Sequence, residues 1–274
     1  MSRAGGGEAL RAADVAAYVE ALAPRESGVP RDDNGFTFGD PDTAVRGIGV
    51  TWMPTAEALR EAAGLGLNLL VVHEAWWFDA QRSPWYDDLP GPSKPVNLGR
   101  LALLTGNGLC LYRCHSNWDA RPGDGVADRI GPALGLEREV ARGRFTRVFE
   151  VAPLALADLA AQVRERLGLP AVRFFGDPAR EVRRVAPLIG GFGGNQFSIP
   201  EEVHRLGAEA VVAGDLVEYV TLHALELGLG VVEALHSATE NPALRRLTEL
   251  LRERFPQVPV RYLESGARRH LHVV

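Results

Sequence analysis

Histidines and carboxylates stand close together at three places in this sequence, and side chains of these types can bind metal ions. In each pair an imidazole and a carboxylate are separated by no more than four positions. The six residues are His73, Glu74, His115, Asp119, His236 and Glu240. Each pair offers one nitrogen and one oxygen, so together they could hold two hard or borderline divalent cations.

Chance is the alternative explanation, because seven histidines and 35 acidic residues in 274 positions will produce some neighbours. A single pair of this kind is more often a solvated surface feature than a ligand set. All three pairs, however, follow short apolar runs that are typical of strands. In open α/β sheets, ligands gather beyond the carboxyl ends of the strands. The three pairs together therefore favour a shared metal site.

Composition and charge narrow the class of protein. An apolar share of 46% and a charged share of 24% are ordinary for a globular protein. The net charge of -5 argues against nucleic acid and anionic membranes as partners, and favours a small molecule, a metal or another copy of the chain. Residues 1–8 lack the apolar core of a secretory signal, and no apolar run reaches 18 residues, so we expect a cytoplasmic location and no membrane span.

Apolar runs alternate with helical patterns along the whole chain, which predicts an α/β fold. The expected strands are 47–52, 68–73, 108–114, 144–151, 171–175, 182–189, 210–213, 230–235 and 258–263. The expected helices are 11–22, 55–65, 96–106, 123–134, 155–167, 199–206, 217–227 and 238–254. A charged stretch near residues 136–144 suggests two halves, 1–140 and 141–274.

Two segments interrupt the alternation of predicted strands and helices. Residues 79–97 contain four prolines and predict a long, stiff loop, which would serve either as a lid over the site or as a subunit contact. Residues 190–195 read Gly-Gly-Phe-Gly-Gly-Asn, which predicts a glycine-rich turn; phosphate binding by its backbone is the alternative. Cys110 and Cys114 lie too far apart on one strand for a disulfide and are predicted to be free thiols.

The motifs resemble those of the Nif-three-like proteins, some of which carry the name type 2 GTP cyclohydrolase I. His115-Ser116-Asn117-Trp118-Asp119 is similar to the family's His-x-x-x-Asp, and His236-Ser237-Ala238-Thr239-Glu240 matches its closing His-x-x-x-Glu. Other similar segments are Asp33-Asn34-Gly35 with Gly39-Asp40, Gly49 to Thr55, Leu70 to Glu74 and Val212 to Asp215. The resemblance covers nearly the whole chain, and the two spaced motifs in this order are its specific part.

The resemblance implies two intertwined α/β halves with mixed sheets, a ring-shaped hexamer and a two-metal centre. The six residues named above would be the ligands, with Asp119 or Glu240 as the bridge. Glu74 stands where the family has a second histidine. Its carboxylate can still bind a metal, but it favours harder ions such as Mn²⁺ or Mg²⁺ over Zn²⁺. Tyr219 departs from the histidine that many members carry after the Gly-Asp pair.

Two divalent ions, whether Zn, Mn, Fe or Mg, would acidify a water molecule and polarise an electrophile, which suits hydrolysis of a C–N or phosphoester bond. The resemblance implies a nucleotide or related small molecule as substrate, by opening of the imidazole ring of GTP. Glu74 could alternatively act as a general base rather than a ligand. The competing class of function is a non-catalytic metal carrier or an oligomeric scaffold, which would lack a substrate cavity with fixed polar groups. The sequence leaves open whether the protein is an enzyme.

Overall fold

The chain folds into two compact units. The structure, a computed structural model, describes residues 9–79, 88–191 and 196–273. Unit 1 comprises Met1–Asn117 and Leu247–Ser265, and unit 2 comprises Trp118–Arg246 and Gly266–Val274. The chain therefore starts in unit 1, builds most of unit 2 and returns to complete unit 1.

This division differs from the single boundary that the sequence suggests near residue 140. The charged stretch there contains β5 (Arg138–Arg142), a strand of unit 2. β5 lies at the edge of its sheet, and its residues alternate between exposed and half-buried. A solvent-facing edge strand can carry many charges, so the loss of the apolar pattern marks an edge and not a gap between domains.

Unit 1 is built on a five-stranded sheet in the order β1-β4-β3-β2-β11. The strands are β1 (Gly35–Phe38), β2 (Ile48–Thr51), β3 (Leu69–Val72), β4 (Cys110–Arg113) and β11 (Val260–Leu263). Four of them run parallel, and β1 pairs antiparallel with β4. All residues of β2, β3 and β4 are buried, as expected for parallel strands covered on both faces.

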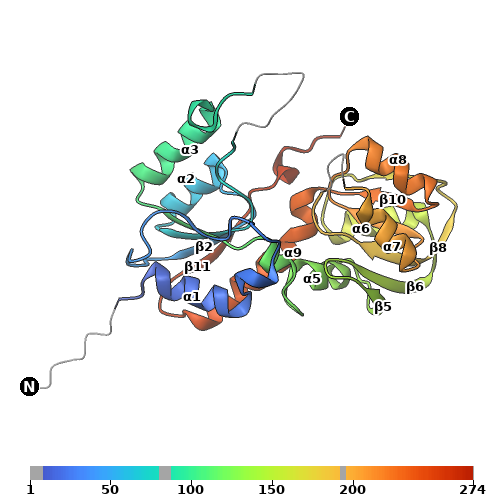
Figure 1. The fold of residues 1–274 in the computed structure, drawn as a ribbon, viewed down its shortest axis with the longest axis horizontal. Helices are drawn as coiled ribbons and strands as arrows, with labels where there is room; N and C mark the ends of the chain where they lie inside the picture. Colours follow the sequence, from blue (N-terminus) through green and yellow to red (C-terminus); the bar gives the residue numbers. More distant parts are fainter. Residues whose placement is uncertain (1–8, 80–87, 192–195, 274) are drawn as a thin grey trace, which may run out of the picture. The chain divides into compact units, whose positions relative to one another are not determined.

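Helices cover both faces of this sheet. α2 (Ala56–Gly64) and α3 (Pro95–Gly106) lie on one side, and α1 (Ala12–Leu22) lies on the other (Figure 1). Leu59 of α2 and Leu104 of α3 join Leu70 and Leu111 of the sheet in one buried cluster. α3 begins with a proline, which is well suited to the first helical position. The loop predicted over residues 79–97 thus ends at Pro95, and residues 80–87 of it lie outside the described part of the chain.

Unit 2 contains a six-stranded mixed sheet in the order β5-β6-β8-β9-β10-β7. Its further strands are β6 (Arg147–Ala155), β7 (Arg173–Phe175), β8 (Glu181–Pro187), β9 (Ala210–Ala213) and β10 (Gly230–Glu233). β8, β9 and β10 run parallel, while β5, β6 and β7 pair antiparallel with their neighbours. The two mixed sheets confirm the predicted α/β class.

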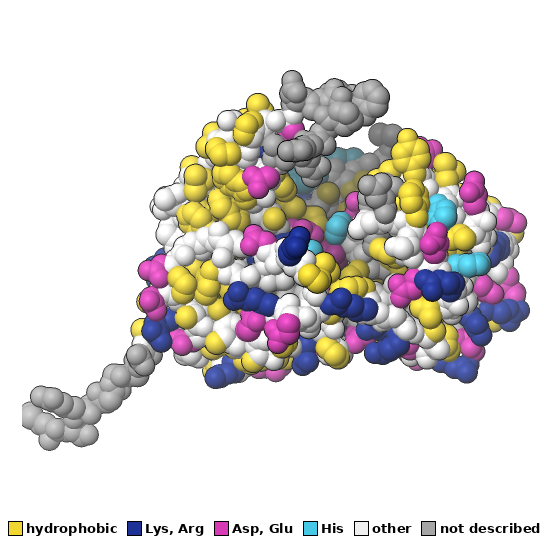
Figure 2. Space-filling view, in the orientation of Figure 1, with side chains coloured by type: hydrophobic (Ala, Val, Ile, Leu, Met, Phe, Trp, Pro, Cys, Tyr) yellow, Lys and Arg dark blue, Asp and Glu magenta, His cyan; other side chains and the backbone are white. Residues whose placement is uncertain are grey.

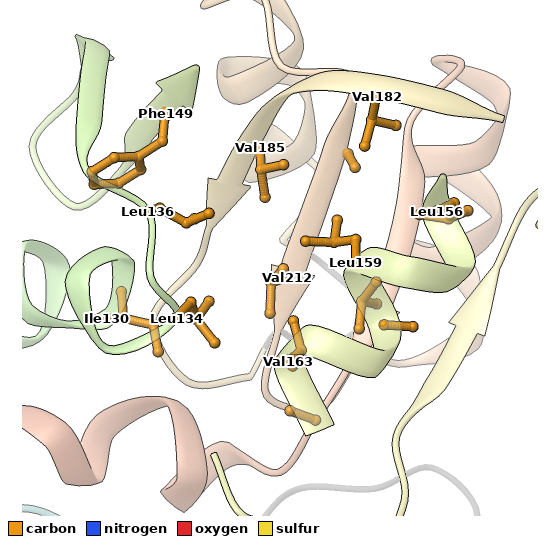
Figure 3. Packing of buried hydrophobic residues seen from close by; sticks show 14 of the residues in the cluster. Ile130, Leu134, Leu136, Phe149, Leu156, Leu159, Val163, Val182, Val185 and Val212 are labelled. Atoms are coloured by element: carbon orange, nitrogen blue, oxygen red, sulfur yellow. The ribbon is translucent and has the colours of Figure 1, made fainter. Parts of the chain in front are cut away.

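Alternation along the central strands explains how this sheet is covered on both faces. Val212 and Val232 point into one buried cluster, while Val211 and Val231 point into another. Figure 3 shows the first cluster, in which Leu159 of α6 lies over the sheet. The helices of unit 2 are α5 (Val126–Ala133), α6 (Leu156–Arg166), α7 (Ser198–Arg205), α8 (Glu218–Glu226) and the first part of α9 (His236–Arg254).

Cys110 and Cys114 are buried and are not joined in a disulfide, as predicted. In the described part of the chain, no helix combines the length and the apolar character that a membrane crossing requires.

Candidate metal centre

His73 directly follows β3, and its environment fixes which ring nitrogen carries the hydrogen. The residue is fully buried, with 0% exposure. Its Nδ1 lies 3.0 Å from the carbonyl oxygen of Cys114. A carbonyl oxygen can only accept, so Nδ1 donates and the lone pair of the neutral ring is on Nε2. Metal-binding histidines are commonly oriented by a backbone carbonyl in this way.

His115 lies just beyond the end of β4, the strand next to β3 in the sheet. Its Nδ1 lies 2.8 Å from Oδ2 of Asp32, and its backbone N–H donates to Oδ1 of Asn34 at 2.8 Å. The carboxylate acceptor at Nδ1 again leaves the lone pair of the neutral ring on Nε2. This Nε2 is 3.8 Å from Oε1 of Glu74.

His73, Glu74 and His115 form a cluster of metal-ligating groups within unit 1. The two imidazole rings have centroids 4.9 Å apart. A ligand atom of His73 lies within 4.8 Å of one on His115 and of one on Glu74. Two Nε2 donors with one carboxylate oxygen suit a borderline or hard divalent ion. The donor set and its tautomers therefore fit a metal ion.

Asp32 is a residue of this site that the sequence analysis did not single out. Its Oδ2 accepts from the backbone N–H of Ser116 at 3.0 Å and from the Ser116 hydroxyl, and its Oδ1 accepts from Arg113 at 2.7 Å. Burial opposes the charge, but the donors from His115, Ser116 and Arg113 outweigh it and hold the pKa of Asp32 well below its usual range. Its place directly before the Asp33-Asn34-Gly35 segment was the only signal in the sequence.

His236 and Glu240 form the corresponding cluster of unit 2. His236 is the first residue of α9 and follows β10, and its Nε2 lies 3.1 Å from Oε1 of Glu240, one helical turn later. Its Nδ1 lies 3.0 Å from Oδ1 of Asp215, which stands just after β9. Burial lowers the pKa of His236, but Asp215 and Glu240 together outweigh burial and raise the pKa to about 10. Without a metal ion, the ring is an imidazolium between two carboxylates.

The backbone of Gly190 lies close to the side chains of His236 and Glu240 in unit 2. Its φ is +55°, and a Cβ at this position would come within 2.4 Å of His236 Nε2 and 2.5 Å of Glu240 Oε1. Its backbone N–H donates to Oγ1 of Thr239 at 3.2 Å. Glycine is therefore required here by close approach as well as by backbone conformation. The rest of the predicted glycine-rich turn, residues 192–195, lies outside the described residues.

Within unit 1, the structure brings His73, Glu74 and His115 together. Within unit 2, it brings His236 and Glu240 together. Asp119 is the last residue of α4 (Ser116–Asp119), where the chain passes from unit 1 into unit 2, and it is 5% exposed.

Tyr219 is not part of either cluster of ligands. It lies on α8 and is 70% exposed. Leu222 of the same helix is also exposed, and Figure 2 shows hydrophobic side chains, in yellow, in the region of α8.

Imidazole and carboxylate donors at the carboxyl ends of parallel strands define an α/β protein with candidate metal-ligand groups in both of its units. A comparison with protein families gives this class a name. The model of the Duf34/NIF3 (NGG1p interacting factor 3) family matches residues 10–267. The chain therefore belongs to this family, and the resemblance seen in its motifs is confirmed.

Curated relatives and a solved structure agree with this assignment. A protein of Streptomyces coelicolor named "GTP cyclohydrolase 1 type 2 homolog" is 31% identical over 247 residues, which cover 85% of this chain and 82% of that protein. A Clostridium perfringens protein of the same name is 24% identical over 250 residues, covering 88% and 91%. The fold is similar to the crystal structure of a Bacillus cereus protein related to NIF3, with a TM-score of 0.78, 17% identity, and coverage of 98% and 99%.

Proposed function

We propose that this protein is a metal-dependent hydrolase with a two-metal centre. The observation that carries the proposal is the oxygen acceptor beside Nδ1 of both His73 and His115. Each ring can therefore donate through Nδ1, which leaves Nε2 to a ligand. The ligands proposed are the six predicted from the sequence. They are His73, Glu74, His115, Asp119, His236 and Glu240.

The residues of the chain have distinct roles in this proposal. Two bound divalent ions would supply Lewis acidity and an activated water molecule. His73 and His115 hold their metal ligand atoms in fixed orientations, because Cys114 and Asp32 restrain the two rings. His236 would lose the Nε2 proton that faces Glu240 before its Nε2 binds, while its Nδ1–H continues to donate to Asp215.

A nucleotide or a related small molecule is the proposed substrate. The names of the Streptomyces and Clostridium relatives support GTP as the first compound to try. In the opening of the imidazole ring of GTP, the oxygen of water adds to C8 of the purine and the bond between C8 and N9 breaks. N9 takes a proton from the water, and C8 stays on N7 as a formyl group.

The experiment is a hydrolysis assay with the metal-loaded protein. The native chain and Glu240→Ala are each incubated with Mn²⁺, Zn²⁺ or Fe²⁺, and GTP and other nucleotides are followed by loss of purine absorbance and by mass spectrometry. Ring opening by the native chain, and not by the variant, is the expected result. Metal binding without turnover of any nucleotide or phosphoester would instead favour a carrier or scaffold.

Glu74 has two alternative roles in this mechanism, as a metal ligand or as a general base. As a ligand, Glu74 would be needed for metal retention, so Glu74→Gln would lower both the metal content and the activity. As a general base, it would be needed only for the reaction, and Glu74→Gln would keep its metal and lose turnover. Metal content and rate, measured on one preparation, decide between the two roles.

The homo-oligomer implied by the resemblance stays a prediction. Light scattering of the purified chain would show a mass near six times 29.7 kDa if the hexamer forms.

A further inference from the structure

Asp32 receives hydrogen bonds on both carboxylate oxygens. Oδ2 accepts from Nδ1 of His115 at 2.8 Å, from the backbone N–H of Ser116 at 3.0 Å and from the Ser116 hydroxyl. Oδ1 accepts from the guanidinium of Arg113 at 2.7 Å. The carboxylate is mostly buried, with its side chain 11% exposed. So many donors around one buried carboxylate fix its position and its orientation.

We propose that Asp32 is a positioning residue of the metal centre, which selects the Nδ1–H tautomer of His115 and so directs Nε2 of this ring to the metal. The inference rests on the proposed metal centre, because a preferred tautomer matters only if Nε2 binds a ligand. Carboxylates that orient metal-binding histidines act on ligand basicity and ring direction, and their loss weakens metal binding about 10 to 100-fold.

The donors around Asp32 require a carboxylate and not an amide. Arg113 and the Ser116 N–H can only donate, and they face different oxygens of Asp32. An asparagine has one oxygen and one NH₂ group. If the NH₂ takes the place of Oδ1, it faces the guanidinium of Arg113, which is also a donor. If it takes the place of Oδ2, it faces the backbone N–H of Ser116 and also presents an N–H to Nδ1 of His115. The isosteric amide would therefore release or reverse the tautomer of His115 while the volume of the side chain stays the same.

Arg113 extends this restraint to the second histidine of the cluster. Its Nε donates to the carbonyl oxygen of His73 at 3.1 Å, while its Nη1 donates to Oδ1 of Asp32. The side chain of Arg113 is only 8% exposed. Asp32 thus holds His115 directly and, through Arg113, supports the backbone of His73.

The test is Asp32→Asn, studied by calorimetric titration with Zn²⁺ alone and by ¹⁵N NMR of the histidine side chains in metal-free protein at alkaline pH. We expect native His115 to show the Nδ1–H tautomer and Asp32→Asn to show loss of this preference. The Zn²⁺ affinity is expected to fall about 10 to 100-fold. Asp33→Asn is the matched control, because it removes the same charge from the adjacent, exposed residue and should change neither result.

A double-mutant cycle with His115→Ala excludes a merely structural role. If Asp32 acts mainly through His115, then Asp32→Asn should lower the Zn²⁺ affinity much less in the His115→Ala background than in the native chain, and the small remaining loss would come through Arg113 and His73. An equal loss in both backgrounds would overturn the proposal, as would an unchanged tautomer in Asp32→Asn. If the native chain binds none of Zn²⁺, Mn²⁺ and Fe²⁺ while its tautomer depends on Asp32, the proposed metal centre fails and only the selection of the His115 tautomer by Asp32 stands.

Discussion

His115 in unit 1 and His236 in unit 2 are each paired with a carboxylate at Nδ1. Each follows a parallel strand, and Nδ1 of each faces a carboxylate, from Asp32 in unit 1 and from Asp215 in unit 2. The partners differ in exposure, because the side chain of Asp32 is 11% exposed and that of Asp215 is 63% exposed. The same pairing of histidine and carboxylate therefore occurs once in a buried setting and once near solvent.

The raised pKa of His236 predicts that metal binding releases a proton. With a pKa of about 10, the metal-free ring is protonated at pH 7.5, and a metal can bind Nε2 only after that proton leaves. The apparent metal affinity should therefore rise as the pH is raised toward 10. Titration calorimetry at pH 7.5 in buffers of different ionisation enthalpy should reveal this proton, and His236→Gln should release fewer. Heats that do not depend on the buffer would contradict the prediction.

Gly190→Ala should remove metal binding in unit 2, beyond its effect on stability. The new Cβ would meet His236 Nε2 and Glu240 Oε1 at 2.4 and 2.5 Å. Gly228→Ala is the control, since Gly228 also has a positive φ, of +80°, but has open space around it. Both variants should lose about 1 to 2 kcal/mol from backbone strain. Only Gly190→Ala should lose metal, as measured by elemental analysis together with thermal unfolding.

The ligand types of the site could be predicted from the sequence, but the residues that orient them could not. His115 and Asp119 stand out because their spacing is local. Asp32 lies 83 residues before His115, and the contact between them depends on how the chain enters β1. Nothing in the local sequence signals a contact made at such a distance.

At the scale of elements, the apolar pattern is informative where strands are buried on both faces. The runs at Leu69–Val72 and Ala210–Ala213 are strands with every residue buried, and both were predicted. β1 and β5 were missed. β1 is a short strand of four residues that begins at a glycine, and β5 alternates exposed with half-buried residues and has charged side chains at both kinds of position. Neither contains the continuous apolar run by which the other strands are identified.

Two helical glycines should respond oppositely to alanine. A Cβ on Gly131 of α5 would meet the buried ring of Phe149 at 2.3 Å, so Gly131→Ala should destabilise the protein by about 1 to 3 kcal/mol through overpacking. Gly99 of α3 has nothing within 4 Å of the added atom. Gly99→Ala should therefore stabilise the helix by about 0.5 to 1 kcal/mol. Thermal unfolding of both variants compares the two effects, and a loss of stability in Gly99→Ala would contradict this account of α3.

For the whole molecule, the sequence does not predict that the chain returns from unit 2 to complete unit 1. The predicted halves meet near residue 140, whereas β11 returns to pair with β2 in unit 1 after more than a hundred residues of unit 2. Parallel pairing between distant strands leaves no mark on the strands themselves. The helices in which this chain passes between the units, α4 and α9, also carry Asp119 and Glu240.

The proposed two-metal centre can be tested by the metal content of the chain, purified without chelator and measured by elemental analysis. We expect about two metal ions per native chain. We also expect fewer ions in His115→Ala, which removes a ligand of unit 1, and in Glu240→Ala, which removes one of unit 2. A native chain that holds no metal, even after incubation with Mn²⁺, Zn²⁺ and Fe²⁺, would contradict the proposed metal centre.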